Sequence, residues 1–263
     1  MMNILDTIIA SKRREVALRK AECPFGVLSK RVESLCGSVM SGRSFRSALL
    51  HSDSGIIAEF KRKSPSRGFI KRDAEVSVIA EGYARSGASA MSVLTDGPFF
   101  GGTLEDLRMA RRTVDLPLLR KDFIVDEYQV FEAKAAGADA ILLIAAALSP
   151  GEVQGLARTA RELGLEVLLE IHREEELDHL CEEADVVGIN NRDLATFVTD
   201  TARSLQLAER IPARFVKISE SGISVPETVK ELRKAGFRGF LMGENFMKEP
   251  DPAAALKNFI EVL

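Results

Sequence analysis

Short apolar runs recur along the chain, and each is about the length of a β-strand. They cover residues 55–60, 89–95, 116–123, 139–145, 166–171, 185–190, 214–221 and 239–244. Between them, apolar residues recur every three or four positions, as they do on one face of a helix. This second pattern covers residues 74–87, 103–114, 126–137, 151–164, 173–183, 200–211, 225–236 and 251–263. Continuous apolar strands that alternate with helices predict a parallel sheet that helices cover on both faces.

The number of strand–helix units favours a closed barrel over an open sheet. Eight units in a chain of 263 residues predict an α/β fold, the (β/α)8 TIM barrel, which reaches this size as a single domain. An open, doubly wound sheet is the alternative, and it more often has a glycine-rich phosphate loop after its first strand. Here the first strand is followed by KRKSPSRG, residues 61–68. We expect residues 1–54 to form an N-terminal helical extension packed on a catalytic barrel of residues 55–263.

The first sixteen residues, MMNILDTIIASKRREV, have the pattern of an amphipathic helix. Ile4, Ile8 and Ile9 share one face, and a basic group that starts at Lys12 marks the end of the segment. The segment lacks the basic region, apolar run and small-residue cleavage site of a signal peptide. No apolar run approaches the roughly 18 residues of a membrane span. We interpret the segment as a packing helix and expect no membrane partner.

Composition and charge add little to this picture. Apolar residues make up 46% of the chain and charged residues 29%, and the net charge of −3 does not favour nucleic acid as a partner. Cys23, Cys36 and Cys181 lack metal-site spacing, and their odd number fits a reducing compartment, so we expect a cytoplasmic protein. His172 and His179 lie in a glutamate-rich segment that we interpret as a solvated helix face. We therefore expect no metal site.

The candidate chemistry lies where the apolar strands end. In a (β/α)8 barrel the active site is built at the C-terminal ends of the strands. Polar residues stand at that end of six of the eight predicted strands: Glu59 and Lys61, Lys121, Glu170, Asn190 and Arg192, Glu220 and Ser221, and Gly243 and Glu244. Any one of these charges could be a structural ion pair or a solvated strand end. Lysines and glutamates gathered at one rim instead favour acid–base chemistry.

Two glycines after the last two strands suggest a phosphate site. Gly222 in ESGIS and Gly243 in MGE stand where barrels commonly bind phosphate through backbone N–H groups, and the hydroxyl of Ser64 could assist. Either glycine alone would more often be a simple turn residue. The loop PFFGG, residues 98–102, is either an aromatic wall over the site or a packed loop with a glycine turn.

Several motifs together resemble one enzyme family. IIAEFKRKSPSRGFI, LLRKDFIVDEYQV, ILLI, LLEIH, GINNRDL, ISESGI and LMGENFM follow in the order and spacing of the indole-3-glycerol phosphate synthase family, from about residue 50 to the C-terminus. The resemblance implies a carbon–carbon lyase of tryptophan biosynthesis that uses no cofactor or metal. Its substrate would be the phosphorylated small molecule 1-(2-carboxyphenylamino)-1-deoxyribulose 5-phosphate. The enzyme would close the pyrrole ring with loss of CO2 and water.

The resemblance also implies roles for residues at the strand ends. Lys121 resembles the general acid that protonates the ribulose carbonyl, and Glu170 resembles the group that transfers protons during dehydration. Lys61 would pair with the substrate carboxylate and is a second candidate acid, and Glu59 would orient it. A second lysine and partial burial should lower the pKa of Lys121 toward neutral pH, whereas the glutamates act in the opposite direction. Which lysine acts at each step stays open.

The remaining site residues follow from the same resemblance. Asn190, Glu220 and Ser221 would complete the catalytic group, beside Arg192; Phe100, Phe123, Leu142, Leu194 and Leu241 would hold the substrate's apolar part; and Ser64, Gly222, Gly243 and the backbone of Glu244 would hold its phosphate.

Two other functions fit a phosphate-binding barrel. Phosphoribosylanthranilate isomerases have a cysteine at the end of the first strand as part of a Cys/Asp acid–base pair, whereas Glu59 and Lys61 stand there in this chain. A catalytically inactive barrel that only binds its ligand is the second alternative, and the full set of acid and base residues weighs against it. For the assembly we favour a monomer over a dimer.

Overall fold

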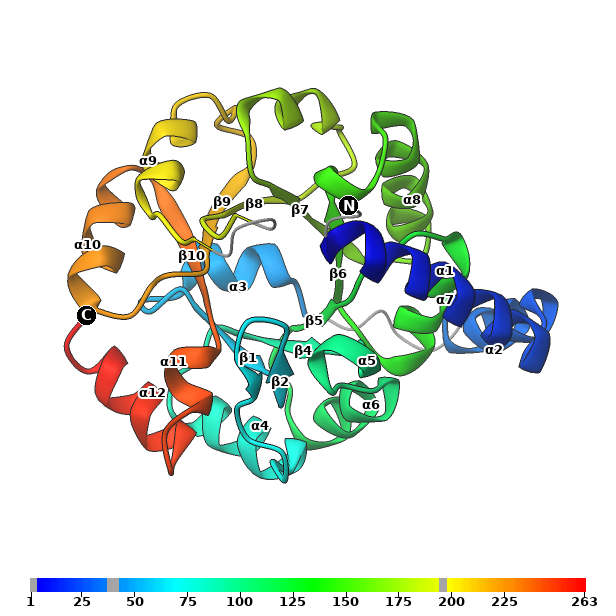
Figure 1. Cartoon of the computed structure of the whole chain (residues 1–263), viewed down its shortest axis with the longest axis horizontal. Coiled ribbons are helices and arrows are strands. Elements are labelled where there is room, and N and C mark those ends of the chain that lie inside the picture. The colour runs from blue at the N-terminus through cyan, green and yellow to red at the C-terminus, as the bar shows by residue number, and fades with distance from the viewer. Residues whose placement is uncertain (1–3, 37–42, 194–197) are drawn as a thin grey trace.

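A closed parallel barrel forms the centre of the molecule (Figure 1). The computed structural model describes residues 4–36, 43–193 and 198–263. The barrel strands are β1 (Ile56–Phe60), β4 (Ala90–Leu94), β5 (Leu118–Lys121), β6 (Ala140–Ile144), β7 (Glu166–Ile171), β8 (Val186–Asn190), β9 (Val216–Glu220) and β10 (Phe237–Met242). Each strand pairs with the next along the chain, and β10 pairs with β1. The predicted TIM barrel is confirmed, and the open sheet is wrong.

Helices surround the barrel (Figure 1). They are α4 (Val76–Arg85), α6 (Leu104–Thr113), α7 (Glu127–Ala136), α8 (Pro150–Glu162), α9 (Ala202–Ala208), α10 (Pro226–Lys234) and α12 (Pro252–Ile260). Shorter elements stand at the strand ends: the hairpin β2 (Lys63–Ser64) and β3 (Gly68–Phe69), α5 (Gly97–Phe100), η1 (Ala145–Ala147) and α11 (Glu244–Met247).

One predicted helix is wrong. The segment 173–183 contains a 3-10 helix, η2 (Glu174–His179), in place of an amphipathic α-helix. The Glu176 carboxylate turns back and accepts a hydrogen bond of 2.6 Å from the backbone N–H of His172. This bond holds the connection tightly against the end of β7.

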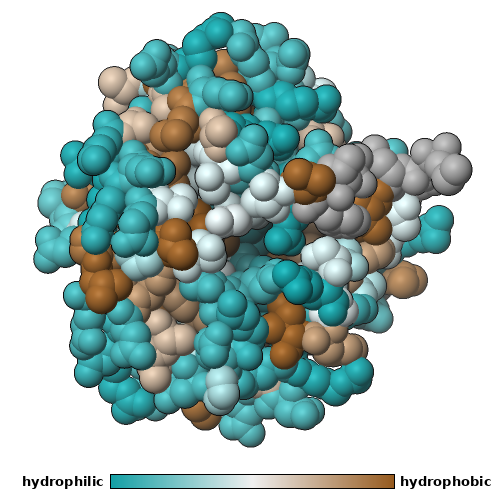
Figure 2. Space-filling model, turned by 60° about the vertical axis from the view of Figure 1, so that its left-hand side comes forward, coloured by the Kyte–Doolittle hydropathy of each residue, from teal (hydrophilic) through white to brown (hydrophobic). Residues whose placement is uncertain are grey.

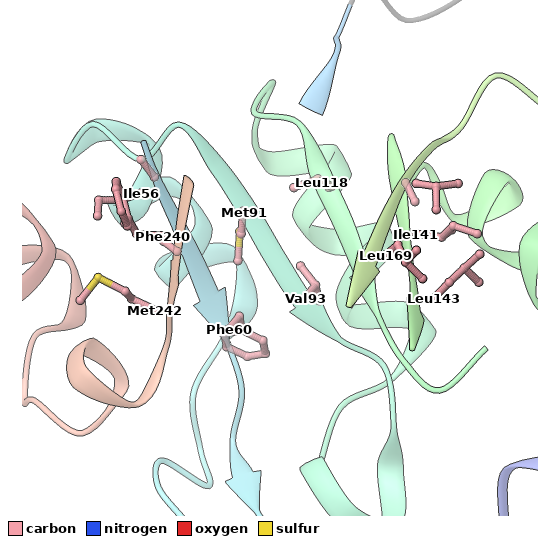
Figure 3. Close-up of a cluster of buried hydrophobic side chains, with 14 of the residues drawn as sticks. Ile56, Phe60, Met91, Val93, Leu118, Ile141, Leu143, Leu169, Phe240 and Met242 are labelled. Carbon is pink, nitrogen blue, oxygen red and sulfur yellow. The ribbon is translucent and has the colours of Figure 1, made fainter. Parts of the chain in front are cut away.

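Strand alternation decides which residues face the barrel interior. In β1, the alternate residues Ile56, Ala58 and Phe60 pack outward against the helices, where Met91, Val93 and Phe240 join them (Figure 3). Ile57 belongs to the separate cluster inside the barrel, with Leu119 and Leu168. Glu59 lies two residues after Ile57 and therefore faces the same interior, at the C-terminal end of the strand.

The N-terminal segment contributes three helices, α1 (Ile4–Glu22), α2 (Phe25–Cys36) and α3 (Phe45–His51). Phe45 and Leu49 of α3 are buried in the interior cluster beside Ile57 and Ala90, so this helix closes the N-terminal end of the barrel. The α1 helix lies toward the opposite end, where its first two turns reach the cavity described below. None of the helices in the described ranges combines the length and apolar character needed to cross a membrane.

The buried face of α1 differs from the predicted one. Its buried residues are Leu5, Ile8, Lys12 and Val16, spaced three or four apart as a packing face requires. Lys12 therefore belongs to the buried face and not to a solvated basic end. Hydrophilic residues dominate the face shown in Figure 2, with apolar residues scattered among them.

Candidate active site

A cavity lies at the C-terminal ends of the strands. The space in it that no atom fills, including the part open to solvent, is about 900 Å³. It gathers most of the residues that the sequence predicted: Glu59, Lys61, Ser64, Phe100, Lys121, Phe123, Leu142, Glu170, Asn190, Arg192, Glu220, Ser221 and Leu241. Leu194 lies outside the described residues.

Two lysines meet three glutamates inside this cavity. Lys121 Nζ lies 3.1 Å from Glu170 Oε2 and 3.4 Å from Glu220 Oε2. Lys61 Nζ lies 2.6 Å from Glu59 Oε1. The three glutamates are at most 5% exposed. Charges buried this deeply are found where they are paired, and here the pairs face an open cavity.

Strand register explains how the carboxylates come together. Glu170 of β7 is paired with Gly188 of β8, and Glu220 of β9 is paired with Asn190 of β8. A Cβ at Gly188 would collide with Glu220 Oε1, so the glycine leaves the space that this carboxylate occupies. The Asn190 side chain accepts a hydrogen bond of 3.0 Å from the backbone N–H of Arg192. Its amide is thereby fixed at the rim.

The pKa values of the cluster are pushed apart. Burial alone would lower the pKa of Lys121, but Glu170, Glu220 and Glu59 raise it above the ordinary value. The expected lowering of the pKa of Lys121 is wrong, because three carboxylates outweigh burial and the neighbouring Lys61 is itself paired with Glu59.

The two carboxyl groups beside Lys121 also differ from each other. Burial raises the pKa of Glu220 to about 8, since the repulsion of Glu170 and Glu59 adds to burial and Lys121 only partly offsets both. Burial acts the same way on Glu170, but Lys121 and His172 hold its pKa below the ordinary value. The pKa values of these two neighbouring carboxyl groups are thus displaced in opposite directions. Such a difference is typical of acid–base sites.

Apolar side chains form one wall of the cavity. The rings of Phe100 and Phe123 lie with their centroids 5.9 Å apart, and Leu142 lines the same cavity. Phe100 stands on the one-turn helix α5, which begins at the N-cap Asp96, so PFFGG includes a short helix and is not wholly a loop. A planar aromatic ligand group would pack well against these rings.

The first turns of α1 complete this wall. Ile4, Leu5 and Ile8 line the same cavity as Lys121. Sequence reasoning assigned Ile4 and Ile8 to a packing face and missed their part in the site. Their helical spacing gave no sign of which end of the barrel they would meet.

A second pocket adjoins the first where β9 and β10 end. Ser221, Gly222, Gly243 and Glu244 line it, together with Arg192, Lys61 and Lys248. Gly222 has φ +76, and a Cβ there would collide with Thr199. A Cβ at Gly243 would lie 2.5 Å from Glu59 Oε1. Both glycines are thus required by local geometry, which leaves backbone N–H groups unobstructed beside three cations.

Ser221 has an unusual backbone. Its φ of 65 is the only positive value among the described non-glycine residues. A side chain in this left-handed region costs about 1–2 kcal/mol. Its carbonyl accepts a hydrogen bond of 3.0 Å from Asn191 Nδ2, which helps to hold the turn. Strain at a site residue is typical of a position that function requires.

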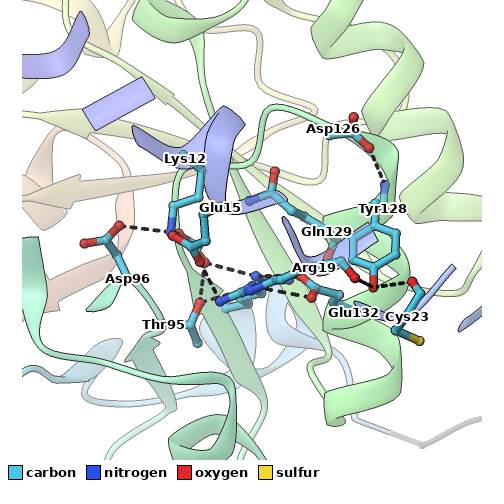
Figure 4. A network of polar contacts seen from close by, with 12 residues as sticks. Lys12, Glu15, Arg19, Cys23, Thr95, Asp96, Asp126, Tyr128, Gln129 and Glu132 are labelled. Carbon is cyan, nitrogen blue, oxygen red and sulfur yellow. Dashed lines mark hydrogen bonds and ion pairs between the residues drawn. The ribbon is translucent and has the colours of Figure 1, made fainter. Parts of the chain in front are cut away.

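A buried charge cluster fixes α1 over the cavity, and sequence reasoning missed it. Lys12 Nζ lies 2.9 Å from Asp96 Oδ2 and 2.9 Å from Asp122 Oδ1, and all three side chains are at most 1% exposed. Figure 4 shows Lys12 directed toward Asp96, with Thr95 and Glu15 beside it. Asp122 follows Lys121 in the chain, so the cluster connects α1 to the segment that carries this lysine. In the described ranges, His, Cys, Asp and Glu form no group of three placed to hold a metal ion.

Solved structures share the fold at low sequence identity. A tryptophan synthase subunit alpha from Legionella pneumophila is 17% identical, with a TM-score of 0.56 over 89% of this chain and 95% of that one. A 3-hexulose-6-phosphate synthase from Salmonella typhimurium is 15% identical, with a TM-score of 0.59 over 80% of this chain and 98% of that one.

Sequence comparisons are more specific. The family described as indole-3-glycerol phosphate synthase matches residues 5–259. Curated proteins of that name are 54% identical in Bacteroides thetaiotaomicron, over 100% of both chains, and 44% identical in Chromobacterium violaceum, over 97% of both. A third, from Laribacter hongkongensis, is 46% identical over 97% of this chain and 98% of that protein. The chain therefore belongs to the indole-3-glycerol phosphate synthase family, the carboxy-lyases of tryptophan biosynthesis.

Proposed function

We propose that this chain converts 1-(2-carboxyphenylamino)-1-deoxyribulose 5-phosphate into indole-3-glycerol phosphate, CO2 and water. The observation that carries the proposal is the Lys121 ammonium, held between Glu170 and Glu220 in a cavity with an aromatic wall. A substrate with an aromatic ring, a carboxylate and a phosphate needs an apolar wall and local cations. The cavity and the adjoining pocket offer both.

Binding would use the two ends of the site. The anthranilate ring packs against the wall that Phe100 and Phe123 form, with its carboxylate on Lys61. The phosphate lies in the adjoining pocket, on the backbone of Gly222 and Gly243, where Arg192 adds positive charge. The ribulose chain then spans the distance between them and brings its carbonyl to Lys121.

Ring closure begins with Lys121. As the aromatic ring attacks the ribulose carbonyl, the carbonyl oxygen becomes an alkoxide, which is more basic than an amine. The raised pKa of Lys121 therefore keeps it protonated before the reaction and still allows transfer to this oxygen in the transition state. Loss of CO2 then restores the aromatic ring.

Dehydration would use the second set of groups. Glu170, ionised because Lys121 and His172 lower its pKa against burial, accepts the proton from the carbon beside the nitrogen. Lys61, held by Glu59, is the acid for the departing hydroxyl. Glu220, whose pKa burial raises to about 8, lies 3.4 Å from Lys121 Nζ and helps to hold this ammonium in place while the first step proceeds.

The direct test mixes purified protein with the carboxyphenylamino substrate and follows indole fluorescence. A rise in fluorescence is expected, and Glu170→Gln should slow it by about 10²–10⁴-fold, as loss of a positioned acid–base group does. Unchanged kcat in Glu170→Gln would remove the dehydration role. Tight substrate binding without a signal would favour the non-catalytic barrel, and turnover of phosphoribosylanthranilate in its place would favour the isomerase.

For the assembly and location we propose a cytoplasmic monomer without nucleic-acid or membrane partners. The net charge of −3 supports the absence of nucleic-acid and membrane partners, and the free thiols Cys23 and Cys181 support a reducing compartment. Light scattering of the purified protein tests the monomer, and the mass of a dimer would contradict it.

A further inference from the structure

His172 is a buried histidine behind Glu170. It follows the last residue of β7, its side chain is 6% exposed, and the interpretation as a solvated helix face is wrong. Neither ring nitrogen makes a hydrogen bond of good geometry to any described residue. Nε2 nevertheless lies 3.4 Å from Glu170 Oε1, and Nδ1 lies 3.6 Å from Glu176 Oε2. The ring therefore stands between two carboxylates.

Glu176 is the last buried group before solvent. Its Oε2 accepts the backbone N–H of His172, and its Oε1 lies 3.4 Å from Nε of Arg173, whose side chain is 71% exposed. A chain of neighbouring groups therefore leads from Lys121 through Glu170, His172 and Glu176 to the surface. The two oxygens of Glu170 face different partners, Oε2 toward Lys121 and Oε1 toward His172.

The charges around His172 favour its protonated form. Carboxylates face it from its own strand (Glu170), from η2 (Glu176) and from β9 (Glu220), and Arg173 lies beyond Glu176. Burial alone would lower the pKa of His172, but Glu176, Glu170 and Glu220 raise it above its ordinary value. An imidazolium can give a proton, and the neutral imidazole that remains can take one back.

The proposed reaction needs a proton from outside the site in every turnover. Ring closure adds a proton to the ribulose carbonyl oxygen, and the carboxylate then leaves as neutral CO2. Dehydration takes one proton from carbon and returns one to the departing hydroxyl. The net result is one proton taken up, and the bound substrate stands between Lys121 and the mouth of the cavity.

We propose that His172 and Glu176 form a relay that carries this proton to Glu170 and on to Lys121. This inference rests on the proposed function. After Lys121 has given its proton to the carbonyl oxygen, the ionised Glu170 receives one at Oε1 from Nε2 of the protonated His172. Rotation of the carboxyl group brings this proton to Lys121 Nζ, and Glu170 is ionised again. The neutral ring keeps its proton on Nδ1, so a flip of the ring turns the free nitrogen toward Glu176, which takes a proton from solvent beside Arg173 and passes it on. Each group of the relay thereby returns to its starting charge, and the contacts of 3.4 and 3.6 Å shorten in the substrate complex, as catalytic hydrogen bonds do.

The test compares His172→Gln and Glu176→Gln with the wild type by steady-state kinetics in H2O and D2O. His179→Gln is the matched control: His179 lies in the same segment as His172, and among the described residues its ring hydrogen-bonds to the backbone carbonyls of Glu176 and Leu148 and to no carboxylate. The relay predicts that each test variant lowers kcat by about tenfold or more, with KM nearly unchanged and a larger solvent isotope effect on kcat. The double variant should be no slower than the slower single one.

Three results would overturn the relay. The first is a kcat in both test variants equal to that of His179→Gln. The second is a lower kcat with an unchanged solvent isotope effect, which indicates a structural role only. The third is additive losses in the double variant. If His172→Gln does not fold, Glu176→Gln decides alone. Wild-type protein that forms no product would refute the proposed function itself, and this is distinguishable from active wild type with unimpaired variants.

Discussion

Replacing Lys12 by Met tests the role of the buried cluster under α1. The substitution keeps the apolar stem of the side chain and removes the ammonium that lies 2.9 Å from both Asp96 and Asp122. Asp122 keeps Arg120, 3.0 Å away and equally buried, and Asp96 keeps its bond to the backbone of Phe99. Asp96 thus loses the one ion pair that it makes among the described residues.

The size of the effect follows from burial and distance. At 2.9 Å and an effective dielectric constant of about 20, each pair contributes about 6 kcal/mol before desolvation. Burying the Lys12 ammonium costs several kcal/mol, which the variant recovers. Removal of one partner from a buried pair typically costs about 3–5 kcal/mol. We expect that loss in the free energy of unfolding, and a higher KM because α1 carries Ile4, Leu5 and Ile8 in the cavity wall.

Urea unfolding and steady-state kinetics measure both effects. Lys20→Met is the matched control, because Lys20 on the same helix lies 2.7 Å from Asp126 but is 41% exposed. Its loss should cost less than about 1 kcal/mol, as exposed pairs do. Equal unfolding free energies for the two variants would refute the reasoning, since distance alone would then count and burial would not.

Three further predictions concern the site. Glu220→Gln should remove the part of the pH dependence of stability that Glu220 causes. The pKa of Glu220 in the folded protein, about 8, lies above its value in the unfolded chain, so its stabilising contribution is complete at low pH and is lost as the pH rises toward 8. Thermal melts at pH 5 and 8.5 should show the variant gaining on wild type at the higher pH; a constant difference would contradict this. Gly243→Ala should place a Cβ 2.5 Å from Glu59 Oε1, cost about 1–3 kcal/mol of stability and raise KM; unchanged kinetics would contradict the packing argument. Phe100→Ala should raise KM by about tenfold or more, with a smaller effect on kcat, because it removes one side of the aromatic wall; an unchanged KM would place the ring elsewhere.

The rim of the site could be predicted because it depends on topology alone. Once eight strands close into a parallel barrel, the residues that end them meet at one end, and strand alternation directs Glu59 and Glu170 inward. The family resemblance then selected roles for them. The one-turn helix under Phe100 and the 3-10 helix after β7 depend on local hydrogen bonds that periodicity does not reveal.

What the sequence did not reveal depends on contacts between distant segments. The sequence pattern places Lys12 in a basic group at the end of its segment. Its buried partners, Asp96 and Asp122, lie more than eighty residues away in the chain, so the pattern does not reveal them. His172 reads as solvated because its segment is rich in glutamate, yet Glu176 folds back over it. The pKa of Lys121 depends on how many carboxylates come within reach, and only the folded barrel brings three of them to it.

The most direct test of the account is Lys121→Met in the indole assay, beside a measurement of substrate binding. We expect kcat to fall by about 10²–10⁴-fold, as loss of a general acid does, while the substrate still binds through its ring and phosphate. Lys20→Met serves again as the control for a lysine outside the site. Near-wild-type turnover in Lys121→Met would contradict the central claim that this ammonium protonates the ribulose carbonyl.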